Sequence, residues 1–182
     1  MNRLRTLFLF FVGISSNIHA MEHRHGVGKL LISQDESLWS VRLIIPAMDA
    51  VGFEHVPETP EQKNTTNKLK YRLEQNIDVI ELADNCSMIS VTQSLFERQG
   101  LSPEQYPKEP ESHFDHEHHS KFGHNDIEVE YQFNCEGVVS RISVLLFKII
   151  PSLSQVQAQW VRNGSQGMAN ISRGRPFIEM EQ

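Results

Sequence analysis

Residues 127–133 of this 182-residue chain read Ile-Glu-Val-Glu-Tyr-Gln-Phe, with an apolar side chain at every second position. Successive side chains of an extended strand point to opposite faces, so this alternation predicts a strand with one buried face and one solvated face. The strand leads directly into Cys135. A chain that contains such a strand should be built on a sheet that covers a core with one of its faces.

Other segments on both sides of this strand carry strand-like patterns. Residues 27–34 and 38–45 flank the turn Asp-Glu-Ser and predict a hairpin. About seven strands are expected in all, the remaining ones within residues 87–96, 138–147, 156–161, 168–172 and 177–180.

One substantial helix is expected between the second and third strands. Thr59-Pro60-Glu61-Gln62 combines a Thr N-cap, a proline at the first helical position and a Gln that completes a capping box. The apolar residues then fall at helical spacings, which predicts one buried face made of Leu69, Leu73, Ile77 and Ile80. The predicted fold class is therefore α+β, with a largely antiparallel sheet or two packed sheets and one substantial helix.

The first twenty residues differ from the rest of the chain. Arg3 and Arg5 precede a short apolar run at residues 7–14, and Ala20 offers a cleavage site. This layout is typical of a secretory signal peptide, and the alternative is an uncleaved membrane anchor. We expect a single soluble domain over residues 21–182, because no later segment is apolar enough to cross a membrane.

The charge of the chain bears on its partners. Loss of the first twenty residues removes two basic side chains and no acidic one, so the net charge changes from −6 to −8. An acidic chain without a basic patch argues against a nucleic-acid partner and favours cations near its surface.

Cys86 and Cys135 are the only two cysteines. An even number of cysteines in an exported chain predicts one disulfide, and a pair of thiolate metal ligands is the alternative. A disulfide here would also be expected to tie down both ends of the polar segment that separates the two cysteines.

That polar segment, at about residues 97–125, contains the most distinctive tract of the chain. Residues 113–124 read His-Phe-Asp-His-Glu-His-His-Ser-Lys-Phe-Gly-His. Neutral imidazoles and carboxylates are ligands for zinc and related metals, so a flexible His-rich loop is expected to bind metal. The alternative is a solvated polar loop. The candidate ligands are His113, Asp115, His116, His118, His119 and His124.

A second group of candidate ligands lies closer to the N-terminus. His23 and His25 would share one side of an extended strand. Asp49, Glu54 and His55 follow the second predicted strand, and ordinary turn chemistry is their alternative role, with Asp49 capping a short helix.

Several of these motifs resemble the periplasmic zinc-binding proteins related to ZrgA, which are associated with zinc uptake. The resemblance rests on His23-x-His25-Gly26, on Pro46-Ala-Met-Asp49-x-x-Gly52-Phe53-Glu54-His55, and on the two cysteines that flank a His-rich insertion. Leu146-Phe147, Pro151 and Gln159-Trp160-Val161 extend it. The resemblance implies a periplasmic, non-catalytic zinc-binding protein that assists a zinc transporter, with His113, His116, His118, His119 and His124 as its main ligands.

Two other functions were weighed against this one. A metal-dependent hydrolase would use His23, His25 and His55 with Glu54 as the base, but the chain has no His-Glu-x-x-His motif and no nucleophile elbow. A structural or interaction domain whose histidines sense pH or metal is the third possibility.

Overall fold

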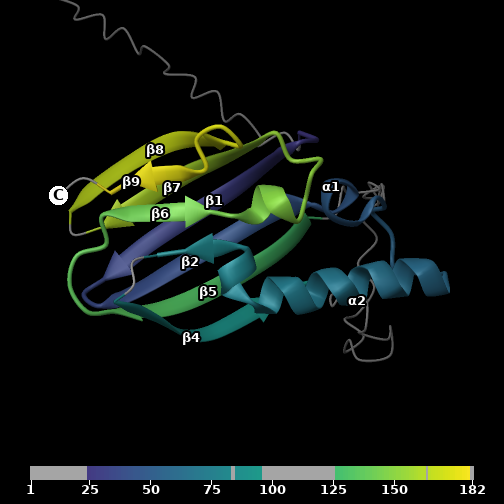
Figure 1. Ribbon diagram of the computed structural model, residues 1–182, viewed down its shortest axis with the longest axis horizontal. Coiled ribbons are helices and arrows are strands. Elements are labelled where there is room, and N and C mark those ends of the chain that lie inside the picture. Colours follow the sequence, from purple (N-terminus) through teal and green to yellow (C-terminus); the bar gives the residue numbers. More distant parts are fainter. Residues whose placement is uncertain (1–23, 83–84, 96–125, 163, 181–182) are drawn as a thin grey trace, which may run out of the picture.

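The computed structural model describes residues 24–82, 85–95, 126–162 and 164–180, and these residues form two sheets and two α-helices (Figure 1). The candidate ligands His23, His113, Asp115, His116, His118, His119 and His124 lie outside the described residues. No helix within the described ranges has the length and apolar character needed to cross a membrane.

The larger sheet has six strands, and it is mixed. Its six strands are joined by five ladders, of which four are antiparallel and one, in the interior of the sheet, is parallel. Its order is β4 (Cys86–Gln93), β5 (Asp126–Cys135), β2 (Leu38–Pro46), β1 (Val27–Asp35), β7 (Gln155–Arg162) and β8 (Ser165–Ser172). The α+β prediction is confirmed. The sheet, which was expected to be largely antiparallel, is mixed, because β1 and β7 pair in parallel.

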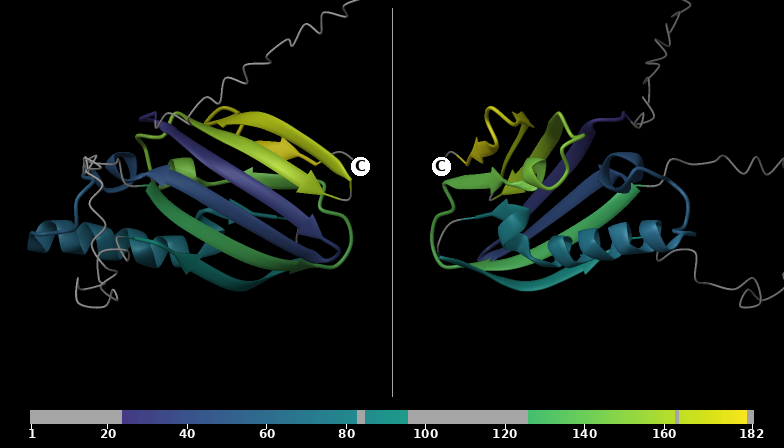
Figure 2. Two further views of the ribbon diagram at one scale, coloured as in Figure 1. Left: turned by 180° about the vertical axis from the view of Figure 1, so that it is seen from behind. Right: turned by 45° about the vertical axis from the view of Figure 1, so that its right-hand side comes forward.

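The smaller sheet consists of β3 (Ile80–Glu81), β6 (Arg141–Val144) and β9 (Phe177–Glu179). It lies on the same side of the six-stranded sheet as the long helix, as the views in Figure 2 show. The space between these layers holds one continuous core. Nine strands are described where about seven were expected, and the two-residue β3 is too short for an alternating pattern to reveal it.

The alternation of apolar and polar residues at 127–133 gives the strand one buried face, as predicted. Val129, Tyr131 and Phe133 are buried on the inner face of β5, while Glu128 and Glu130 are on the outer face, turned away from the core. The Tyr131 hydroxyl donates a hydrogen bond to the Leu73 carbonyl oxygen. Burial raises the pKa of Tyr131 well above its usual value.

The long helix, α2 (Pro60–Glu74), begins as predicted. The Thr59 side chain accepts from the Gln62 N–H, and the Gln62 side chain accepts from the Thr59 N–H. Leu69 and Leu73 are buried. The prediction was wrong for Ile77, whose side chain is 73% exposed in the short 3₁₀ helix η1 (Asn76–Asp78), because the helix has already ended.

The apolar segment 138–147 is only partly a strand. β6 is followed by a second 3₁₀ helix, η4 (Leu146–Lys148), with Leu146 and Phe147 buried. The spacing of apolar residues does not distinguish a strand from a 3₁₀ helix here. A short segment that is buried on both sides is continuously apolar in both conformations.

The predicted disulfide between Cys86 and Cys135 is present and joins directly opposed residues of β4 and β5. Its position corrects one expectation. The described chain stops at Leu95 and resumes at Asp126, which lie at the other ends of these two strands. The disulfide therefore does not hold the ends of the 96–125 segment together, and the β4–β5 ladder lies between them and the bond.

Candidate metal-binding end of the sheet

Three segments, of which the first two carry candidate ligands, meet at one end of the six-stranded sheet, which we call the histidine end. They are residues 24–26 before β1, residues 46–56 after β2, and Asp126 at the start of β5. Pro46 pairs with Asp126 in the β2–β5 ladder. A small hollow brings Arg24 and Val27 next to the same two residues. The short helix α1 (Ala47–Val51) lies at this end, on the right of Figure 1.

A hydrogen bond fixes the chain just after His25. The Gly26 N–H donates to the Asp49 carboxylate at 2.6 Å, which ties the start of β1 to α1. Gly26 has a positive φ of 76°, a conformation that favours glycine. Two serines support the same contact, because the Ser154 hydroxyl donates to the Gly26 carbonyl oxygen and the Ser152 hydroxyl to that of Asp49.

The role expected for Asp49 is thus corrected. α1 follows Pro46 and has no side-chain cap, so Asp49 does not cap it. The carboxylate is used instead to hold a segment that lies 23 residues earlier in the chain. A charge-assisted hydrogen bond of this kind is stronger than a neutral one, and it fixes the backbone next to the exposed His25.

His55 follows the turn at Gly52, which has a φ of 85° and ends α1. Its ring lies 5.3 Å from the ring of the buried Phe53, centroid to centroid. The Nδ1 atom is 2.9 Å from the Val56 carbonyl oxygen. A carbonyl oxygen only accepts, so Nδ1 carries the proton and the neutral ring keeps its lone pair on Nε2.

Gln62 supports the same tautomer of His55. The Gln62 side-chain oxygen accepts from the N–H groups of Glu58 and Thr59, so its amide nitrogen is the group directed at His55 Nε2, at 3.5 Å. An NH₂ group donates, and Nε2 must therefore accept. A histidine ligand binds metal through one ring nitrogen while the other donates to a protein oxygen, which is the arrangement of His55.

The described residues alone do not complete a metal site. No group of three or more His, Cys, Asp or Glu side chains with metal-binding geometry occurs within the described ranges. His25 and His55 are both exposed, and Glu54 is half-buried. Of the side chains in the hydrolase interpretation that the structure describes, both histidines thus lie on the surface.

Sequence reasoning missed the residues that position these histidines. The sequence suggests Asp49 as a candidate ligand or a local cap, and it gives no direct reason to assign Ser152, Ser154 or Gln62 as supports. The signal for Gln62 was present, since the capping box was recognised and His55 precedes it by seven residues. No comparable signal links Asp49 to Gly26, because the contact depends on how β1 and β2 pair.

The comparisons with known proteins point to one family. A model of the family described as ZrgA family zinc uptake protein matches residues 22–180. No curated protein matches the chain.

Proposed function

This chain belongs to the ZrgA family of zinc uptake proteins, and from that premise we propose that it binds Zn²⁺ in the periplasm and delivers it to a component of a zinc transporter. Residues 1–20 would direct export and be removed. Zinc is the cargo here, and no chemical step is required of the protein.

The observation that carries this proposal is the density of candidate zinc ligands in the stretch of sequence just before Asp126. His113, His116, His118, His119 and His124 lie within twelve residues, and the last of them is two positions before Asp126. Asp126 pairs with Pro46, the residue that leads into α1. Three or four imidazoles suffice for a tetrahedral zinc site, and an added carboxylate such as Asp115 is a common supplement.

His55 and His25 fit an accessory role in the same site. The Nδ1–H of His55 donates to the Val56 carbonyl oxygen, which leaves Nε2, the atom that faces the Gln62 amide, as the ring nitrogen that would coordinate zinc. His25 precedes the Gly26 N–H that Asp49 fixes. Both side chains are exposed, which suits an ion that must be accepted and later released.

Zinc titration by calorimetry tests this proposal. The protein lacking residues 1–20 is compared with a variant in which the five tract histidines, His113 to His124, are replaced by alanine. The variant should lose the high-affinity binding event. A variant with only His55→Ala should keep the stoichiometry and bind more weakly. Affinity for the unaltered protein should fall below about pH 6.5, where imidazoles become protonated.

Equal affinity and stoichiometry in the unaltered protein and the five-histidine variant would overturn the proposal. Asn170→Ala, an exposed change on the outermost strand β8, serves as the matched control and should leave the zinc isotherm unchanged. Circular dichroism of all variants separates loss of ligands from loss of fold.

A further inference from the structure

Among the strands that the structure describes, none pairs with the outer backbone edge of β8, the last strand of the six-stranded sheet. It pairs with β7 on one side only. The Ser172 N–H and carbonyl oxygen are both bonded to Arg175 rather than to β7. Since backbone groups alternate along a strand, those of Gln166, Met168 and Asn170 also face away from β7. Within the described residues, no backbone partner is found for these three.

The sequence of this edge lacks the features that usually prevent strands from pairing. Residues 165–172 read Ser-Gln-Gly-Met-Ala-Asn-Ile-Ser, without a charged residue or a proline. Native edge strands are commonly protected by lysines, prolines or bulges. The ladder between β7 and β8 is regular over all eight residues, so no bulge bends this edge away.

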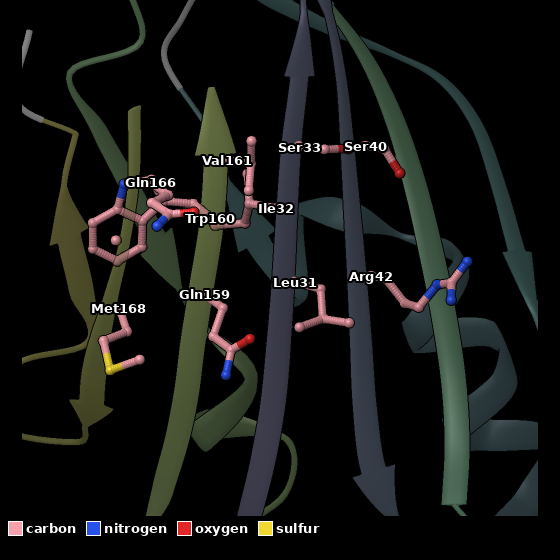
Figure 3. A pocket seen from close by; sticks show the side chains of 11 residues that line it. Leu31, Ile32, Ser33, Ser40, Arg42, Gln159, Trp160, Val161, Gln166 and Met168 are labelled. Atoms are coloured by element: carbon pink, nitrogen blue, oxygen red, sulfur yellow. The ribbon is translucent and has the colours of Figure 1, made fainter. Parts of the chain in front are cut away.

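The outer face next to this edge is partly apolar and hollowed. A hollow of about 570 Å³ runs over β2, β1, β7 and β8, and Figure 3 shows Leu31, Gln159 and Met168 along one row across it. Met168 is 76% exposed and Val161 is 58% exposed. Met168 is therefore a large apolar side chain at the open border of the sheet.

The inner face of the same edge has a half-buried tryptophan. The Trp160 indole lies across Gly167, where an added Cβ would come within 2.2 Å of the ring. Gly167 and Trp160 are directly opposed in the β7–β8 ladder. Gly167 thus lets the indole lie against β8, where Trp160 remains half-buried.

We propose that β8 pairs antiparallel with β8 of a second copy of this chain, around a two-fold axis at Met168. In this register Met168 faces Met168 of the other copy, and Gln166 faces Asn170. Each of these residues exchanges its outward N–H and carbonyl oxygen with its opposite, because hydrogen-bonded pairs of an antiparallel ladder share both bonds. The two six-stranded sheets become one continuous sheet.

The side chains are complementary in this register on both faces. On the outer face the two thioethers contact each other, and the amides of Gln166 and Asn170 can donate to and accept from one another. On the inner face Gly167 is opposite Ala169 of the second copy, which brings a methyl group beside the Trp160 indole. A closed two-fold contact of this kind uses the same patch twice and ends at two copies.

Charge favours a second copy at this edge over other parts of the surface. The chain carries a net charge of −6, so two copies repel each other in general. β8 presents no charged side chain at its edge, and the row through Leu31, Gln159 and Met168 is also neutral. The contact is small, so the dimer should dissociate on dilution.

Cysteine cross-linking tests the register. Cys86 and Cys135 are bonded to each other, so Met168→Cys introduces the single free thiol. Opposed Cα atoms in this register lie about 5.5 Å apart, within disulfide range. The matched control Asn170→Cys places its two thiols four residues out of register, about 13 Å apart. Mild oxidation should give a covalent dimer with Met168→Cys and little with Asn170→Cys.

Sedimentation measures the association without a cross-link. The apparent mass of the unaltered protein should rise with concentration toward two copies. Met168→Glu places two carboxylates directly opposite each other and should abolish the rise, whereas Ile89→Glu, an exposed change on the other edge strand β4, should not. The unaltered protein staying a monomer at every concentration, or equal cross-linking of both cysteine variants, would overturn the proposal. Neither readout depends on zinc.

Discussion

The two ends of the six-stranded sheet are built in different ways. At one end a covalent bond joins Cys86 to Cys135. At the histidine end, the full length of β5 away, about 30 Å for ten residues, hydrogen bonds alone join Gly26 to Asp49. The difference shows that the covalent bond lies at the end of the sheet opposite the contact between Gly26 and Asp49.

This separation has a functional meaning under the proposed mechanism. A disulfide stabilises the fold mainly by restricting the unfolded chain, wherever it is placed. Placed at the far end, it leaves the positions of Leu95 and Asp126 to the hydrogen-bonded β4–β5 ladder. Loss of the disulfide should therefore lower the stability of the protein without changing its affinity for zinc.

The largest effect is expected from removing the covalent link. Replacing Cys86 and Cys135 together by alanine should lower the free energy of unfolding by about 2–4 kcal/mol, because the disulfide closes a loop of 49 residues. Urea denaturation measures the loss. Zinc affinity under native conditions should stay the same, and a parallel loss of affinity would show that the two ends are coupled.

Removing the link at the histidine end should have a smaller effect on stability. Asp49→Ala leaves the half-buried Gly26 N–H without its acceptor and should lower the free energy of unfolding by about 1–3 kcal/mol. Asp49→Asn retains an oxygen acceptor and should lose less. In contrast to the cysteine variant, Asp49→Ala should also weaken zinc binding if His25 contributes, which calorimetry would detect.

The middle of β5 offers a test by pH. The pKa of Tyr131 is raised in the folded protein, so the folded state keeps the phenol proton and stability falls as pH rises above about 10, the unfolded value. Tyr131→Phe should remove that part of the alkaline loss, at a cost of about 1 kcal/mol at neutral pH for the missing hydrogen bond. Tyr71→Phe, at a position that is 67% exposed, is the control. Denaturant midpoints between pH 7 and 11 provide the measurement.

The smallest effect is expected in the three-stranded sheet, away from both ends. The hydrogen bond from Arg141 holds the pKa of the exposed Glu179 below its usual value. Stability from this pair is present above the unfolded pKa of Glu and is lost as pH falls through the lower, folded value. Glu179→Gln should change the thermal midpoint only slightly at pH 7, and less still in high salt.

The parts of the fold that the sequence predicts are those decided by neighbouring residues. The capping box at Thr59 and the alternation through Phe133 require only local contacts, and both are confirmed. Ile77 fits the helical spacing but lies beyond the end of α2, and the residue type of its C-cap, Gln75, does not signal the end of a helix. The apolar residues keep a helical spacing beyond the last turn of α2, so this spacing predicts a longer helix than the one present.

In the candidate site, too, the sequence predicts what depends on single residues and misses what depends on contacts between distant segments. The histidines are visible as residues, and their chemistry follows from their type. Their supports depend on pairing between distant segments, such as the contact of Asp49 with Gly26 or the pairing of Pro46 with Asp126. The order of residues along the sequence does not reveal these long-range pairings. It also does not reveal that the disulfide and the histidine end lie at opposite ends of the sheet.

The parallel contact between β1 and β7 sets the order in which the molecule can be completed. Val27 is paired with Gln155, so the first strand to be synthesised gains its second neighbour only when most of the chain exists. Until then β1 has one open edge, and contacts between such remote segments form slowly. A chain interrupted before Gln155 would leave that edge permanently exposed, which makes incomplete products candidates for aggregation and rapid proteolysis.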